Sequence, residues 1–345
     1  KPAYVRVRVQ APGRTPEASS SVAVPAEAAD HVSIPLATRD RAQKAGLGDF
    51  DGDGRLDYLV KTPDFNTDPY QRPGYWKKSE DTYKLTAYRH DGKKLWTYDM
   101  GWAIEEGIWY SPVIVCDLDG DGRDEIILGS AALSHEGKPL WNTKKGHPDV
   151  CYVADFDPAR PGLEIFYGLE KAQPRGGVAL HDARTGVEIW GNPEKTVHVH
   201  SQGMVGDIVP EEPGIECYAG ESKGGTGWWL YAASGKLINR EDLGELAPKA
   251  IYWLDGPTKV YVSGKKIYRW PREAVGQFPG RIVAIADFLG DWREDVIVAM
   301  DGELRIYTTT VPTDRRRPWL MEDPLYRNDV TMQTMGYFYP PQLSK

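Results

Sequence analysis

The sequence predicts an all-β fold, a β-propeller of about seven blades, with six to eight as the range. Three observations support this prediction. An acidic turn motif recurs along the chain, a hairpin motif followed by tryptophan alternates with it, and hairpins at Asp91, Glu136 and Asp182 lie 45 and 46 residues apart. Four antiparallel strands in about 45 residues form one propeller blade. The 36 glycines and 26 prolines among 345 residues indicate many turns, and therefore short strands.

The two ends of the chain differ from the repeats. Residues 1–30 contain a strand-like run and a Ser/Ala/Pro-rich stretch, and we expect them to be the tail of a β-sandwich domain or a linker. The propeller, which would be the catalytic domain, then covers residues 31–345. We expect residues 31–36 to supply a strand that closes the ring against residues 329–335, because closure removes exposed sheet edges.

The acidic turn has two nearly identical copies, at residues 48–57 and 116–125. In each copy, carboxylates alternate along a glycine-bent loop with an arginine carbonyl between them, which is an oxygen-only ligand set that suits Ca²⁺. Such carboxylates would repel one another without a cation. We expect several calcium ions, which pin the turns rather than take part in chemistry. The predicted ligands are Asp49, Asp51, Asp53, Arg55 and Asp57 in the first copy, and Asp117, Asp119, Asp121, Arg123 and Glu125 in the second.

Three degenerate copies of the turn motif begin at Asp155, Asp207 and Asp287. The last of these lacks a carboxylate at its third position and has Trp292 where glycine is expected. It is predicted to be a metal-free turn in which an aspartate bonds Arg293.

Histidines and cysteines are sorted by their place in the repeat. His90, His135 and His181 occupy hairpin positions, so we expect surface turn residues. The three cysteines, Cys116, Cys151 and Cys217, lie far apart in apolar runs. They are expected to be small buried hydrophobes rather than disulfide partners or zinc ligands.

The loops between blades line one mouth of a propeller, where ligands bind. His147 lies in such a loop, and His198 and His200 lie in the corresponding loop one blade later, on one face of an extended stretch. Each histidine alone fits a structural role, and the shared location favours a functional one. The other loops in this position add Asn66, Trp109, Tyr110 and Lys223. Together with a divalent ion, these groups are suited to an acidic sugar.

Residues 137–164, 286–298, 304–314 and 321–341 resemble the rhamnogalacturonan lyases of polysaccharide lyase family 11. The resemblance covers most of the predicted propeller. It implies a calcium-rich propeller that cleaves the rhamnose–galacturonate backbone of pectin by β-elimination.

The resemblance also implies roles for particular residues. His147 matches a cleft histidine associated with calcium, Tyr337 a sugar-contacting tyrosine and Asn66 a rhamnose-contacting asparagine. Gln202 stands where the family has a cleft arginine, and Arg281 is the cation nearest to an absent cleft lysine. After residue 125 the chain runs into a segment that resembles a later blade, so one or more of the family's eight blades is shortened or missing.

We therefore expect a lyase for a rhamnose–uronate polysaccharide, foremost rhamnogalacturonan I. The expected catalytic residues are His147, His198, His200 and Tyr110, and the expected substrate-binding residues are Asn66, Trp109, Gln202, Lys223, Arg281 and Tyr337. Two alternatives stay open. One is a lyase for ulvan or another rhamnose–glucuronate polymer, and the other is a non-catalytic carbohydrate-binding or adhesion propeller.

The composition limits the partners and the compartment. With 50 acidic and 42 basic side chains, the chain has a formal charge of −8, which argues against nucleic acid or an anionic membrane as a partner. We expect a monomer that meets an acidic polysaccharide. Because free calcium and polymeric sugars occur outside the cytoplasm, we expect an extracellular or periplasmic protein.

Overall fold

The chain separates into two compact units, Lys1–Arg39 and Asp40–Lys345. The expected boundary at residue 31 falls inside the first unit. In a computed structural model, the described residues are four short strands before residue 33 and then residues 33–64, 81–103, 112–222, 224–244, 248–333 and 339–345. The first unit has two antiparallel pairs, β1 (Ala3–Val5) with β4 (Val22–Val24) and β2 (Arg8–Val9) with β3 (Glu17–Ala18).

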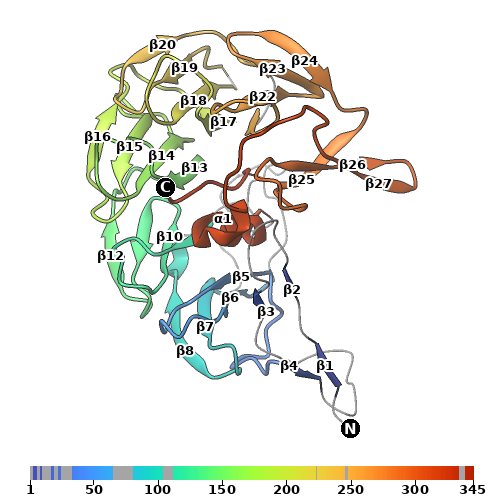
Figure 1. Ribbon diagram of the computed structural model, residues 1–345. Coiled ribbons are helices and arrows are strands. Elements are labelled where there is room, and N and C mark those ends of the chain that lie inside the picture. Colours follow the sequence, from blue (N-terminus) through green and yellow to red (C-terminus); the bar gives the residue numbers. More distant parts are fainter. Residues whose placement is uncertain are drawn as a thin grey trace. The chain divides into compact units, whose positions relative to one another are not determined.

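The described residues of the second unit form six antiparallel sheets in which strand order follows chain order (Figure 1). The first three sheets are β5 (Lys44–Gly48), β6 (Asp57–Thr62), β7 (Lys84–Tyr88) and β8 (Lys94–Asp99); β9 (Val113–Cys116), β10 (Glu125–Leu128), β11 (Ala131–Leu133) and β12 (Pro139–Asn142); and β13 (Pro148–Ala154), β14 (Glu164–Leu169), β15 (Val178–Asp182) and β16 (Glu188–Gly191). The last three sheets are β17 (Val199–Gly206), β18 (Glu216–Glu221), β19 (Trp228–Tyr231) and β20 (Leu237–Asn239); β21 (Lys249–Ile251), β22 (Val260–Ser263), β23 (Lys266–Arg269) and β24 (Glu273–Gln277); and β25 (Arg281–Ala286), β26 (Asp295–Met300) and β27 (Glu303–Tyr307).

The all-β class is confirmed, and the described residues form six sheets in the second unit rather than seven. The predicted closing strand is wrong. Residues 33–36 form no strand, and residues 329–332 belong to helix α1 (Pro324–Met332). The local reason is the start of this helix, where proline occupies the first turn and the Asp323 side chain accepts the N–H of Tyr326. These signals outweigh the β-forming character of the residues that follow.

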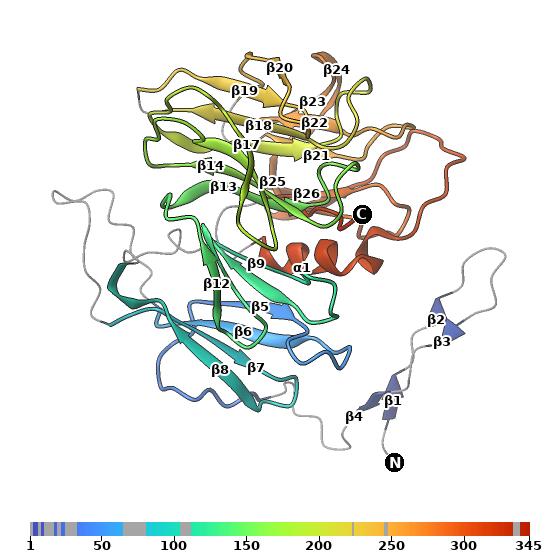
Figure 2. The same ribbon diagram turned by 90° about the vertical axis from the view of Figure 1, so that its left-hand side faces the viewer.

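Helix α1 packs against β5 and β9 (Figure 2). Its Met332 belongs to the apolar cluster of the first and second sheets, and its Leu325 to the cluster of the second and third. Just after the helix, Gln333 Nε2 donates to the Ile285 carbonyl in β25 at 2.7 Å. The C-terminal segment thus contacts both the first and the last sheet. No helix in the described part of the chain has the length and apolar character that a membrane span needs.

The last carboxylate of each acidic turn is buried and closes that turn. Glu216 Oε2 accepts the N–H groups of Ile208 and Val209, both at 2.8 Å. The corresponding bonds are made by Asp57, Glu125, Glu164 and Asp295. Burial raises the pKa of Glu216 to about 8 and that of Glu164 to about 7, because the fold shields the charged form from water.

A tryptophan connects each of three sheets to the next. Trp190, on outer strand β16, donates from Nε1 to the Ala233 carbonyl at 2.8 Å in the hairpin of the fourth sheet. Gly235 in this hairpin has a φ of +84°, and a Cβ on it would lie 2.8 Å from the Trp190 ring. The same arrangement is repeated by Trp96 with Gly137 and by Trp141 with Gly186. The predicted hairpins ending in tryptophan are therefore confirmed and connect neighbouring sheets.

His90 and His135 are partly exposed in their turns, whereas His181 is not a surface residue, so the prediction is wrong for His181. His181 is 1% exposed, its Nδ1 lies 2.9 Å from the Gly186 carbonyl oxygen, and burial lowers its pKa. His135 Nδ1 lies 3.2 Å from Glu125 Oε1, where it supports the turn carboxylate. The cysteines are buried and unpaired with one another, as predicted.

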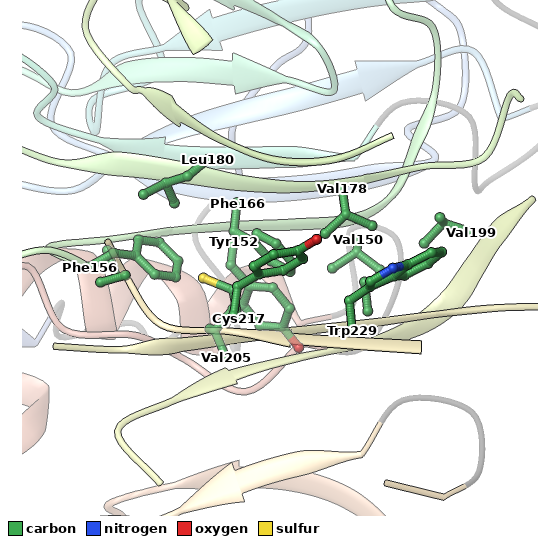
Figure 3. Packing of buried hydrophobic residues seen from close by; sticks show 14 residues of the cluster. Val150, Tyr152, Phe156, Phe166, Val178, Leu180, Val199, Val205, Cys217 and Trp229 are labelled. Carbon is green, nitrogen blue, oxygen red and sulfur yellow. The ribbon is translucent and has the colours of Figure 1, made fainter. Parts of the chain in front are cut away.

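Apolar side chains from the facing sides of the third and fourth sheets fill the space between them (Figure 3). Val150 and Phe166 come from the third sheet, and Val205 and Trp229 from the fourth. The first strands approach closely, because a Cβ on Gly203 of β17 would lie 2.4 Å from the Val150 side chain. The ends of β13 and β17 are thereby held side by side.

Replacing Gly235 by alanine tests the tryptophan contact. We expect G235A to lower the free energy of unfolding by about 3–5 kcal/mol, because the new methyl group meets both an unfavourable φ and the Trp190 ring. The matched control is G302A, where φ is +75° and no atom lies within 4 Å, so that only the backbone cost of about 1–2 kcal/mol remains. If urea unfolding showed the same loss in the free energy of unfolding for both variants, the contact between Trp190 and Gly235 would be contradicted.

The raised pKa of Glu216 predicts a pH-dependent stability. Because the folded pKa of about 8 lies above the unfolded value, the neutral form stabilises the fold fully below about pH 4.5. This contribution is lost as the pH rises through about 8. E216Q stays neutral, so between about pH 5 and pH 9 it should lose less stability than the wild type, by about 1–3 kcal/mol. E211Q, at an exposed carboxylate in the same turn, is the control and should follow the wild type.

Candidate functional site

Five ionisable side chains gather where the third and fourth sheets begin. Because β13 and β14 are antiparallel, the start of β13 lies beside the end of β14. The same holds for β17 and β18. The five residues are His147 and Asp149 at the start of β13, Glu170 just after β14, and His198 and His200 at the start of β17.

Asp149 lies between two imidazoles. Its Oδ1 lies 3.0 Å from His147 Nε2, and its Oδ2 lies 2.6 Å from His200 Nδ1. The His198 ring stacks on the His200 ring with centroids 5.0 Å apart, and His198 Nε2 lies 3.6 Å from Glu170 Oε1. The Asp149 side chain is fully buried and the other four are 14–22% exposed. A buried carboxylate between imidazoles is a site for proton or cation binding.

Backbone hydrogen bonds hold these residues in place. The N–H of Glu170 donates to the His147 carbonyl, and the N–H of Ser222 donates to the His198 carbonyl, both at 3.0 Å. The buried Glu221 carboxylate, at the end of β18, accepts the N–H of His198 at 3.3 Å. The strand ends therefore hold the backbone from which the side chains of His147, Glu170 and His198 extend.

Three groups of residues among those described bring enough ligand atoms together to hold a metal ion. In each group, one ligand atom from every member lies within 4.8 Å of the others. The members are Asp149, Glu170, His198 and His200; Asp49, Asp51 and Asp53; and Asp117, Asp119 and Glu125. The first group mixes nitrogen and oxygen, whereas the other two contain only oxygen.

The two acidic loops have the predicted fold. Both oxygens of Asp49 accept backbone N–H groups, from Gly52 at 2.8 Å and Gly54 at 2.7 Å. Asp57, which was predicted as a ligand, does not join the other three carboxylates of its loop; it accepts the N–H groups of Phe50 and His90.

The second loop repeats this fold with one exchange. Its last carboxylate, Glu125, joins Asp117 and Asp119, whereas the Asp121 side chain accepts the N–H of Arg123 at 2.8 Å. That the carbonyls of Arg55 and Arg123 are ligands stays a prediction.

The turn at Asp287 is built differently, as predicted. Arg293 donates to Asp291 at 2.7 Å. The Asp287 carboxylate accepts the N–H of Gly290 at 2.7 Å and that of Leu320 at 3.0 Å. Trp292 has the positive φ of 72° that glycine has in the acidic loops. The Asp287 carboxylate joins none of the three groups.

The remaining predicted residues lie apart from this cluster or outside the described residues. Arg281 is exposed at the start of β25 and, in the part of the chain that is described, has no hydrogen bond or ion pair to the cluster. Only the backbone of Gln202 is described, within β17. Asn66, Trp109, Tyr110, Lys223 and Tyr337 lie outside the described residues.

Sequence reasoning found the three histidines and missed Asp149 and Glu170. Asp149 follows His147 by two positions, so strand alternation could have placed both on one side of the chain. Glu170 lies just after a fully buried strand, at the same end as His147. Its position beside the histidines can be recognised only once the pairing of β13 with β14 is known.

The sequence profile of the C-terminal domain of rhamnogalacturonan lyase family 11 matches residues 22–127 and 113–345. The chain belongs to rhamnogalacturonan lyase family 11. Within this family, rhamnogalacturonan endolyase YesW of Bacillus subtilis (strain 168) is 36% identical over 299 residues, which cover 79% of this chain and 45% of YesW. Rhamnogalacturonan exolyase YesX of the same organism is 34% identical over 284 residues, covering 73% and 45%.

Solved structures of the family agree with this relationship. The crystal structure of rhamnogalacturonan lyase YesW superposes with a TM-score of 0.71 at 32% identity and covers 87% of this chain and 51% of that one. This family 11 chain spans about half the length of the curated relatives it matches.

Removing metal ions tests the two acidic loops. We expect EDTA to lower the Tm of the wild type and Ca²⁺ to restore it, since a ligand at 100 times its Kd adds about 2.7 kcal/mol per site. The double variant D51N/D119N should respond much less to either, because each loop loses a carboxylate charge while the amide oxygen still accepts the N–H groups of Asp53 and Asp121. D301N, at an exposed hairpin carboxylate, is the control. A wild type indifferent to EDTA would contradict metal binding by the loops.

Proposed function

We propose that the protein is a polysaccharide lyase that cleaves a rhamnose–uronate polymer, foremost rhamnogalacturonan I, by β-elimination. The observation that supports it most is the buried Asp149 between His147 and His200 at one end of the strands. Membership of a family whose relatives include a rhamnogalacturonan endolyase and exolyase supports the substrate class.

The reaction needs a base and an acid near one uronate. The base removes the proton from C5, the electron pair forms the C4–C5 double bond, and the bond from C4 to the glycosidic oxygen breaks. The leaving oxygen takes up a proton from the acid or from water. A lectin needs neither group, whereas a lyase needs both.

Asp149 can set the state of His200. Because Nδ1 of His200 faces Asp149 Oδ2 at 2.6 Å, Nε2 is the ring atom left to take a proton from the substrate. His147 uses Nε2 toward the same carboxylate, so its Nδ1 is the atom left for proton transfer. We assign the acid and base roles to this pair, with Tyr110 assisting. Arg281 and Lys223 would face the uronate carboxylate, and Asn66, Trp109, Gln202 and Tyr337 would contact sugar.

The oxygen-only sets of the two acidic loops fit Ca²⁺, which takes carboxylate and carbonyl ligands in flexible geometry. We propose calcium there, in a structural role. A calcium ion next to the uronate carboxylate would neutralise its charge and make the C5 proton more acidic.

The architecture fits a propeller contracted to six blades. In the described part of the second unit, five sheets have four strands and the sixth has three. Because each sheet contacts chiefly its neighbours, a whole blade can be removed from a propeller without disturbing the blades that remain. A secreted or periplasmic monomer fits a substrate that is a polymer outside the cell.

The lyase reaction can be followed by the ultraviolet absorbance of the unsaturated uronate, with calcium present and rhamnogalacturonan I, ulvan and polygalacturonate as separate substrates. We expect a rise on rhamnogalacturonan I. H147A and H200A should each lower kcat by about 100-fold or more, and R281A should raise KM by about tenfold. R305A, at an arginine of similar exposure on β27, should leave both unchanged.

Other outcomes separate the alternatives. A rise only on ulvan would keep the chemistry and replace the substrate. No rise on any polymer, together with calorimetric binding to one of them, would overturn the lyase assignment in favour of a binding propeller.

A further inference from the structure

We propose that the turn between β25 and β26 carries a second binding surface for an acidic polysaccharide, built on Trp319 and Arg316. This turn follows the end of β25, whereas the histidine cluster stands where β13 and β17 begin, so the two sites lie at opposite ends of the strands. The choice of polymer rests on the proposed function. The binding itself does not, because a surface can hold a polysaccharide that the protein never cleaves.

Exposed apolar side chains gather at this turn. Phe288 and Leu289 lie in it and Trp319 lies against it, and they are three of the ten large apolar side chains that are exposed among the described residues. Single exposed apolar residues are normal on a protein surface, whereas a group of them marks an interaction site. Trp319 is 42% exposed, so much of its ring can meet a ligand.

The Trp319 ring is held in place by the turn. Its Nε1–H donates to the Asp287 carbonyl at 2.8 Å. The ring also lies against Gly290, where a Cβ would be 3.8 Å from the indole. Because the ring is fixed in advance, it loses little conformational freedom when a ligand covers it. An exposed indole of this kind offers an apolar surface to the apolar face of a sugar ring.

The only run of three consecutive cationic side chains in the sequence, Arg315 to Arg317, stands just before this tryptophan. Arg315 faces Asp255 at 3.5 Å. Arg316 is exposed and, within the described part of the chain, bonds only neutral acceptors, which are the carbonyls of Thr313 and Arg315. A guanidinium without a carboxylate partner can bind a carboxylate of a ligand through two parallel hydrogen bonds.

Arg317 anchors the backbone of this run. Its guanidinium lies over the rings of Tyr252 and Trp292, at 5.0 and 4.8 Å from the ring centroids. Tyr252 directly follows β21 in the fifth sheet, and Trp292 lies in the turn of the sixth sheet. Arg316 therefore stands on a backbone that is attached to two sheets, between the anchored Arg317 and the ion pair of Arg315.

A cation three residues before an exposed indole fits a polymer in which uronates alternate with neutral sugars. The Cα atoms of Arg316 and Trp319 are at most about 11 Å apart, so a short stretch of one chain can contact both. The uronate carboxylate then meets the guanidinium, and a sugar ring meets the indole. A nucleic acid or an anionic membrane needs a broader basic surface than this run provides in a chain with a formal charge of −8.

Polymer binding tests the proposal without turnover. The background is H147A, so that the polymer is not cut, and retardation in native gels that contain rhamnogalacturonan I gives the Kd. We expect R316Q and W319A each to weaken binding by about tenfold, because each removes one of the two contacts. W319F keeps an aromatic ring and should retain most of the binding. R160Q, at an exposed arginine in the corresponding turn of the third sheet, is the control and should bind as the background does.

Kinetics in the wild-type background separates this surface from the cleft. If the protein cuts rhamnogalacturonan I, R316Q should raise KM on the long polymer by about threefold or more. It should leave kcat/KM unchanged on a short oligosaccharide that fills only the cleft. If the protein cuts no polymer, the gel measurement still decides, so the binding surface and the proposed reaction can fail separately.

Three results would overturn the proposal. They are polymer binding that stays unchanged in folded R316Q and W319A, a loss in R160Q equal to that in R316Q, and a preference for duplex DNA over rhamnogalacturonan I that R316Q removes. Circular dichroism shows whether each variant is folded. If W319A does not fold because its indole no longer bonds Asp287, R316Q decides, since Arg316 is exposed and bonds only nearby carbonyls.

Discussion

The packing of a tryptophan ring on the hairpin glycine of the next sheet is the constraint on which the rest of the structure depends. Trp190 reaches from β16 to Ala233 and lies so close to Gly235 that no side chain fits there. This contact fixes the outer edges of the third and fourth sheets, while Val150 and Gly203 fix their inner strands. With both edges set, the strand ends that bear Asp149 and His200 cannot move apart without breaking the core between them.

The two kinds of ionic site lie at opposite ends of the strands. Acidic turns join the end of the first strand of a sheet to the start of the second, as Ala154 and Glu164 show in the third sheet. The histidine cluster stands where the first strand begins and the second ends. Buried carboxylates such as Glu216 close the turns by accepting backbone N–H groups, and they do so even where no metal ligands are present. Turn architecture therefore comes from the carboxylate, and among the described residues only the two full copies of the motif add a set of oxygen atoms that could hold a metal ion.

The repeat made most of the fold predictable, because hairpin glycines and turn carboxylates are local signals with one geometric solution. The helix at Pro324 was not predicted because the β-forming Val330 and Thr331 were weighed above the cap at Asp323 and the proline that follows it. Within the site, histidines stand out in a sequence and carboxylates do not. Asp149 and Glu170 are two among 50 acidic residues, and only strand pairing and burial distinguish them. His181 is the opposite case. It stands out in the sequence, but its position in a hairpin did not indicate that its side chain would be buried.

The family profile matches this chain in two overlapping segments, and the contacts between tryptophans and hairpins are consistent with that overlap. The two matched segments overlap at residues 113–127, which include β9 and all but the last residue of β10. These strands therefore fit two places in the family's repeat. A sheet whose first strands come from one repeat and whose last strands come from another can still pack against both neighbouring sheets. It needs a hairpin that contacts the tryptophan of the preceding sheet, and a tryptophan on its own outer strand that contacts the hairpin of the following sheet. The second sheet does both, since Trp96 bonds the His135 carbonyl and Trp141 bonds the Ala183 carbonyl. Loss of whole repeats can thus leave every remaining interface intact.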